Sequence, residues 1–257
     1  MNYLDALFLG CLQGLTEFLP VSSSGHLVLA QTILGVKQPG VAFEVALHFG
    51  SWLAVVAYFH KTIWRLIRSV FDSSMKSERK MIGLLLLGSV PAGVVGLTFK
   101  GMVEGAFANP LLTSILLIVT GVLLLSSRFM IKGHSDVKIL SAVMMGLGQA
   151  LAILPGISRS GSTIVFGMAA QVEPAKAAEF SFLLSLPAIG GAMLLNAGDL
   201  ASLDAVTAGP YLAGMIASFA LSVVAVFTVL AVIRRGRFSW FAYYCFAAGA
   251  LGIYLFK

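Results

Sequence analysis

The chain has 257 residues, of which 58% are hydrophobic and only 11% are charged. Soluble globular domains average roughly 25% charged residues, so this composition argues strongly against a water-soluble fold. The formal net charge of +6 would suggest a nucleic-acid partner in a soluble protein, but here the basic residues cluster in short segments between apolar runs. Such clusters mark the cytoplasmic loops of membrane proteins. We therefore expect a multi-pass membrane protein that has the lipid bilayer, and no nucleic acid, as its partner.

The first predicted element is an interrupted one. Residues 1–40 are apolar, but residues 19–26 break them with a proline, three serines, a glycine and a histidine. Three uninterrupted apolar segments follow at about 41–60, 81–99 and 110–127. A helix of about 20 residues crosses the hydrocarbon core, so each of the three predicts a transmembrane helix.

The second half of the chain has the same order of elements. Residues 137–172 are apolar and are interrupted at 154–163 by proline, glycine and hydroxyl residues, and three spans are predicted at about 177–197, 210–232 and 239–256. Irregular backbone at membrane depth is tolerated only where it is buried in protein or lines a wet cavity. Both interrupted segments therefore predict re-entrant helix-loop-helix pairs.

An offset of 136 residues aligns the two interrupted segments and predicts an internal repeat within one integral membrane domain, residues 1–257. The first unit covers about 1–127 and the second about 137–257. Each unit has one re-entrant pair and three spans, and an odd number of crossings inverts the second unit relative to the first. We therefore predict an all-α polytopic protein with six transmembrane helices and two re-entrant segments in an inverted-topology repeat. The matching residues are Gly10/Gly146, Gln13/Gln149, Leu15/Leu151, Ser22/Ser158, Ser24/Ser160 and Gly25/Gly161.

The charges agree with that topology. If the N-terminus is external, 13 of the 17 basic residues fall in segments predicted to be internal, and Lys37, Lys100 and Lys257 fall outside. Only Arg159 fits neither group, because it lies within the second interruption. A lone cation at membrane depth costs at least a few kcal/mol, so Arg159 requires an anionic partner.

Hydroxyl side chains and glycines surround Arg159, and a helix is expected to resume near Thr163. Hydroxyl donors, a guanidinium and the N–H groups of a helix N-terminus together suit a phosphate. The structural alternative is a salt bridge with Glu17 or Glu179. The predicted anion-binding residues are Ser158, Arg159, Ser160 and Thr163.

The first interruption offers complementary groups. Gln13 and Glu17 are four residues apart and share one helix face. Ser22, Ser23, Ser24 and His26 follow at the turn. In an inverted repeat the two interruptions meet near the bilayer midplane, so a carboxylate, several hydroxyls and an imidazole would face Arg159.

The run QGLTEFLPVSSSGH at 13–26, with PGISRSGST at 155–163, resembles the two signature motifs of the bacterial undecaprenyl-diphosphatase family, also called bacitracin-resistance proteins. The motifs match the family patterns (Glu/Gln)-x-x-x-Glu and Pro-Gly-x-Ser-Arg-Ser-x-x-Thr, with Gln13 at the variable first position. The resemblance implies an integral membrane phosphatase that hydrolyses undecaprenyl diphosphate to undecaprenyl phosphate and inorganic phosphate. It further implies that the product lipid is recycled for peptidoglycan and other cell-wall polymers, and that the protein confers bacitracin resistance.

The resemblance also implies a divalent cation, Mg²⁺ or Ca²⁺, and a location in the bacterial cytoplasmic (inner) membrane with the site opening to the periplasmic side. In this hypothesis Arg159 holds the polyprenyl diphosphate, while Glu17, with Gln13, binds the metal or acts as general base. Ser23 is the first choice of nucleophile, and His26 activates it or protonates the leaving oxygen. Direct attack by His26 or by a metal-bound water is left open, as is a homodimer. The hydroxyls assigned to the diphosphate are those of Ser22, Ser24, Ser158, Ser160 and Thr163.

A carrier is the competing interpretation. Inverted repeats with broken helices also build secondary transporters, so the same architecture suits a flippase or transporter for polyprenyl phosphate or another anion. A carrier needs the cation and the donors, but it has less use for a nucleophile, an imidazole and a carboxylate opposite them. The residues Glu17, Ser23 and His26 therefore favour the enzyme.

Overall fold

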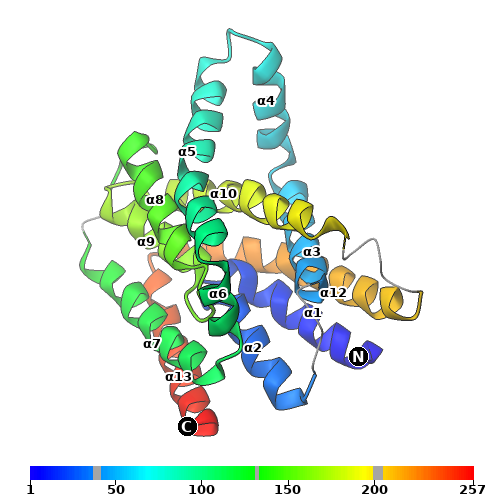
Figure 1. Cartoon of the computed structure of the whole chain (residues 1–257). Coiled ribbons are helices and arrows are strands. Elements are labelled where there is room, and N and C mark those ends of the chain that lie inside the picture. Colours follow the sequence, from blue (N-terminus) through cyan, green and yellow to red (C-terminus); the bar gives the residue numbers. More distant parts are fainter. Residues whose placement is uncertain (37–41, 131–132, 199–204) are drawn as a thin grey trace.

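The computed structural model describes residues 1–36, 42–130, 133–198 and 205–257, which form helices joined by short connections (Figure 1). Lys37, which was predicted to lie on the external side, is not among these residues. The first half contains α1 (Tyr3–Phe18), α2 (Ser23–Leu34), α3 (Ala42–Tyr58), α4 (His60–Phe71), α5 (Lys76–Thr98), α6 (Lys100–Phe107) and α7 (Pro110–Ser126). The second half contains α8 (Ile139–Leu151), α9 (Arg159–Ala169), α10 (Pro174–Leu195), α12 (Ala205–Arg234) and α13 (Phe241–Phe256).

Five helical segments are long and apolar enough to cross a membrane: Lys76–Thr98, Pro110–Phe129, Pro174–Leu195, Thr207–Arg234 and Phe238–Phe256. They confirm five of the six predicted spans. The sixth prediction, residues 41–60, corresponds to α3, whose 17 residues pass the same test only together with α4. The protein is therefore all-helical and crosses the membrane several times.

The segment after α3 was expected to be an internal loop, but it forms helix α4, which is bent by 81° from α3. Three basic residues, Lys61, Arg65 and Arg68, lie along one side of α4, and exposed apolar residues, including Trp64 and Phe71, lie along another. An amphipathic helix of this kind is suited to the boundary between lipid headgroups and acyl chains. The hairpin of α4 and the start of α5 projects from one end of the molecule (Figure 1).

Both predicted interruptions are present between helices. The chain leaves helical geometry after Phe18 and resumes at Ser23, and it leaves again after Leu151 and resumes at Arg159. Helix α1 packs on α12 and α2, while α8 packs on α5 and α9. Two of these crossings are very close, because a Cβ on Gly10 would collide with the backbone of Gly214 in α12, and one on Gly146 would collide with Gly88 in α5.

The second interruption depends on a glycine and on a hydroxyl from α7. Gly156 has a φ of 97°, and a Cβ there would run into the carbonyl of Thr113. The Thr120 hydroxyl donates to the Gly156 carbonyl (2.7 Å) and accepts from the Ser158 amide (3.1 Å). Buried backbone groups need such partners, particularly at membrane depth, so α7 stabilises the break by satisfying its peptide groups.

Candidate active site

The two interruptions touch each other. Ser22 caps α2 by accepting from the Gly25 amide (3.2 Å), and the same oxygen accepts from the Gly156 amide of the second interruption (3.1 Å). In return the Ser160 hydroxyl donates to the Leu19 carbonyl (3.3 Å). Ser22 has a positive φ of 67°, which is uncommon for a residue with a side chain. These contacts bring the polar residues of both interruptions into one buried cluster.

Glu17 is the centre of that cluster. Its Oε1 accepts from Arg159 Nη2 at 2.5 Å, and its Oε2 accepts from Ser23 Oγ at 2.5 Å and from Gln13 Nε2 at 2.9 Å. The Glu17 side chain is only 6% exposed. Charge-assisted hydrogen bonds are short and strong, so one carboxylate holds a cation and a hydroxyl on opposite oxygens.

Arg159 is the first residue of α9 and its side chain is 15% exposed. Of the two carboxylates considered as salt-bridge partners of Arg159, Glu17 forms the ion pair, whereas Glu179 is exposed on α10. A second contact runs from Arg159 Nη1 to the Ser181 carbonyl (3.3 Å). A guanidinium has five N–H donors, and these two contacts leave others for an incoming anion.

The hydroxyls next to Arg159 form hydrogen bonds with backbone groups and neighbouring hydroxyls of the protein. Ser158 caps α9 by accepting from the Gly161 amide (3.0 Å), and Ser160 Oγ lies 3.3 Å from Ser158 Oγ. Thr163 Oγ1 lies 2.5 Å from Ser181 Oγ and donates to the Arg159 carbonyl (2.8 Å). These three predicted binding residues thus have local partners, which fix the helix start that carries the guanidinium.

In the first interruption, Ser24 is half-buried beside Ser22, with their oxygens 3.3 Å apart. His26 has different partners from those expected. Its Nδ1 lies 2.8 Å from the Ser22 carbonyl and its Nε2 lies 2.8 Å from Tyr244 Oη on α13. A carbonyl only accepts, so in the neutral ring Nδ1 carries the proton and Nε2 accepts from the tyrosine. Ser23 is therefore paired with Glu17, and His26 with Tyr244.

Two functional candidates escaped the sequence analysis. His48 on α3 places Nε2 3.6 Å from Glu17 Oε2, and its side chain, 28% exposed, forms the more accessible edge of the cluster. Tyr244 lies on the last helix and stacks on His26, with 5.5 Å between ring centroids. Both contacts join distant parts of the chain, and a histidine or tyrosine within an apolar helix was the only signal available.

The polar cluster contains oxygen atoms that could hold a divalent cation. The described residues contain no group of three His, Cys, Asp or Glu side chains suited to a metal ion. Gln13 Oε1, however, is buried without a hydrogen-bond partner next to the Glu17 carboxylate. Magnesium is commonly held by one or two protein oxygens together with substrate phosphates. The donors Gln13 Oε1 and Glu17 fit an ion of that kind.

Comparison with known proteins gives a consistent result. The family model described as bacitracin resistance protein BacA matches residues 6–251. An undecaprenyl-diphosphatase of Salinibacter ruber is 39% identical over 99% of this chain and 100% of its own length. One from Syntrophotalea carbinolica is 42% identical over 98% of both chains, and one from Methanobrevibacter smithii is 38% identical over 98% of this chain and 96% of its own length.

Proposed function

The chain belongs to the bacitracin resistance protein BacA family, and on that premise we infer that it is an undecaprenyl-diphosphate phosphatase. It hydrolyses undecaprenyl diphosphate to undecaprenyl phosphate and inorganic phosphate, which fits a role in cell-wall synthesis and in bacitracin resistance. The observation that carries the mechanism is the chain of contacts Ser23–Glu17–Arg159 across the two interruptions.

Arg159 binds the diphosphate in the proposed mechanism. Its remaining N–H donors engage the phosphate oxygens, and the guanidinium stabilises the charge that develops during phosphoryl transfer. The α9 N-terminus lies at the same position, because Arg159 is its first residue, and adds a favourable dipole. The hydroxyls of Ser158, Ser160 and Thr163 support this geometry through their contacts with the backbone and with Ser181.

Ser23 is the proposed nucleophile and Glu17 its general base, since the hydroxyl already donates to Oε2. Ser23 Oγ bonds to the terminal phosphorus, its proton passes to Glu17, and the bond to the bridging oxygen breaks. Undecaprenyl phosphate leaves with that oxygen and takes the proton from Glu17. Glu17 then takes a proton from water as the water oxygen bonds to phosphorus. That proton passes to Ser23 Oγ as the phosphorus–Oγ bond breaks, which releases inorganic phosphate.

The two histidines have separate proposed roles. His26 is held by Ser22 and Tyr244 and supports the turn that carries Ser23. His48 lies against the same Glu17 oxygen that accepts from Ser23. Its imidazole therefore affects the basicity of Glu17 and can exchange protons between that carboxylate and water at the accessible edge. Gln13 Oε1 and Glu17 are the proposed ligands of Mg²⁺ or Ca²⁺, which when bound supplies positive charge to the phosphates.

We also propose that the interruptions are re-entrant and that the two halves form an inverted repeat, in the bacterial inner membrane, with the site open to the periplasmic side. Two observations support the repeat. The α1–α12 and α8–α5 crossings each bring a glycine against the backbone of another glycine; Gly10 and Gly146 are related by the predicted offset, whereas their partners Gly214 and Gly88 are 126 residues apart. The predicted offset also relates α7 to α13 and α3 to α10, and the two helices of each of these pairs pack against each other.

Phosphate release from undecaprenyl diphosphate by pure protein tests the function. Wild type and Glu17→Gln are compared with and without a chelator, and we expect release by wild type only and inhibition by the chelator. The glutamine keeps a similar shape, so its effect isolates the carboxylate. A wild-type protein that moves labelled lipid phosphate across vesicles without releasing phosphate would be a carrier, and the proposal would fail.

A further inference from the structure

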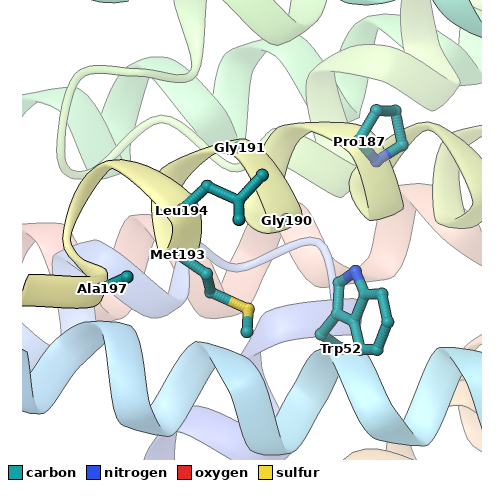
Figure 2. A pocket seen from close by; sticks show the side chains of 7 residues that line it. All are labelled: Trp52, Pro187, Gly190, Gly191, Met193, Leu194 and Ala197. Carbon is teal, nitrogen blue, oxygen red and sulfur yellow. The ribbon is translucent and has the colours of Figure 1, made fainter. Parts of the chain in front are cut away.

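An apolar groove of about 660 Å³ lies between α3 and the second half of α10. Figure 2 shows Trp52 extending from α3 towards α10 and Met193 extending from α10 towards α3, with Gly190 and Gly191 between Met193 and Pro187 along α10. The groove belongs to neither interruption, and the proposed chemistry makes no use of it.

The groove exists because α10 lacks side chains there. A Cβ on Gly191 would meet no atom within 4 Å, and one on Gly190 would meet only Trp52 Nε1 at 3.7 Å. The same Trp52 nitrogen donates to the Leu186 carbonyl at 3.1 Å, which ties α3 to α10 at one end of the hollow. Beyond that tie the two helices leave a space lined by carbon atoms.

The α3 wall of the groove leads towards the catalytic cluster. On α3, Trp52 follows His48 by one helical turn, and His48 Nε2 lies 3.6 Å from the Glu17 carboxylate. On α10, the tie from Trp52 to Leu186 lies between Ser181, whose carbonyl accepts from Arg159, and the groove residues from Pro187 onwards, so the connection runs along α3. The groove therefore starts one helical turn along α3 from His48, which is the accessible edge of the cluster.

We propose that this groove binds the polyprenyl chain of the substrate, starting with the isoprene units nearest the diphosphate. The inference rests on the proposed function, because it takes the diphosphate to be held by Arg159. The lipid attached to that diphosphate must leave a buried polar site along an apolar surface, and the groove is such a surface one helical turn along α3 from His48. Its volume is in the range of ligand cavities, and its glycines let a branched chain approach the α10 backbone.

The test fills the groove without disturbing the protein. Gly191→Leu adds a side chain where a Cβ meets nothing, and leucine is a better helix former than glycine. Gly93→Leu on α5 is the matched control, because a Cβ on the exposed Gly93 likewise meets no atom within 4 Å. Phosphate release is measured from undecaprenyl diphosphate and from dimethylallyl diphosphate, whose single isoprene unit is too short to reach Gly191.

For Gly191→Leu we expect KM for undecaprenyl diphosphate to rise about tenfold, the equivalent of burying about two fewer CH₂ groups, with kcat unchanged. KM for dimethylallyl diphosphate should stay the same, and Gly93→Leu should behave as wild type with both substrates. An unchanged KM for the long substrate, which would mean that ordinary membrane lipid fills the groove, overturns the proposal, as does an equal rise for both substrates.

A direct measurement protects the result from a folding artefact. A prenyl diphosphate with a photoactivatable group on its second isoprene unit should label wild-type peptides containing Trp52 or residues 187–197, and Gly191→Leu should reduce that labelling. If other peptides were labelled while wild type still released phosphate, the proposal that the groove binds the polyprenyl chain would fail. Absence of phosphate release by wild type from either substrate would instead overturn the proposed function, so the two failures are distinguishable.

Discussion

The first and second interruptions share a helix cap, although Ser22 has a φ of 67° and Ser158 a φ of −74°, and they differ in what their side chains do. Ser22 accepts from the amide of Gly25, three residues on, and Ser158, 136 residues later, accepts from the amide of Gly161 in the same way. In both places a serine caps the helix that follows the break. The helices α2 and α9 therefore start with the same cap hydrogen bond.

The difference lies one residue further along. Ser23 and Arg159 are the first residues of α2 and α9, and both contact Glu17, on Oε2 and Oε1 respectively. The position 136 residues after Glu17 is Ile153, so the second half has no carboxylate there. Two equivalent helix starts thus present a hydroxyl and a guanidinium to one shared carboxylate. A duplicated framework has become an asymmetric site through a few side chains.

The largest effect should come from breaking the contact between the halves. We expect Arg159→Ala to reduce kcat/KM for undecaprenyl diphosphate about 10⁴-fold, because phosphoryl transfer loses its cation. Arg159→Lys is the control for charge, and we expect it to recover only a small part, since it lacks the guanidinium fork. The measurement is phosphate release from undecaprenyl diphosphate, and an unchanged melting temperature of the variant shows that it is folded. Full activity of Arg159→Ala would contradict the shared site.

The next effect concerns the hydroxyl on the other oxygen of Glu17. We expect Ser23→Ala to lower kcat about 10³-fold, because water must then attack an oriented diphosphate directly. Ser24→Ala at the adjacent position removes a hydroxyl predicted to bind the diphosphate but not the nucleophile, so it should raise KM and leave kcat within about threefold of wild type. If the two variants lose activity equally, Ser23 is not the nucleophile.

Much of the fold was predictable because long apolar runs determine which segments form helices that cross the membrane. The span predicted at 110–127 is Pro110–Ser126, and that at 81–99 lies, apart from Phe99, within a helix from Lys76 to Thr98. The bend of 81° before α4 was not predicted, because the basic segment was interpreted as a loop from its charge, although Lys61, Arg65 and Arg68 have the spacing of one helix face.

The site was predictable only in part. Motif spacing singled out Glu17 and Arg159, although they are 142 residues apart. It did not reveal that His26 contacts Tyr244, which is 218 residues away, or that His48 contacts Glu17. Helices that are apolar on all sides give no periodic signal for which face meets which neighbour. Those contacts therefore depend on packing that the sequence does not express locally.

A smaller effect should follow from separating His26 from its partner. We expect Tyr244→Phe to lower kcat about fivefold, the value of one lost hydrogen bond of about 1 kcal/mol. Tyr243→Phe, at the neighbouring exposed position, is the control and should match wild type. In a His26→Ala background, Tyr244→Phe should have no further effect, because the contact is already gone. An undiminished loss in that background would show that Tyr244 acts independently of His26.

The smallest effect on activity is expected at the cap of the second interruption. Ser158→Ala should lower the free energy of unfolding in detergent by about 1 kcal/mol, the usual value of a helix N-cap, and change kcat less than threefold. Ser22→Ala removes the equivalent cap but also the contact with the Gly156 amide, so it should lose more stability and more activity. Denaturant titration and phosphate release measure both quantities for the pair. Equal losses from the two variants would mean that the interruptions contribute alike, whereas a larger loss from Ser22→Ala supports a first interruption that also aligns the reacting groups.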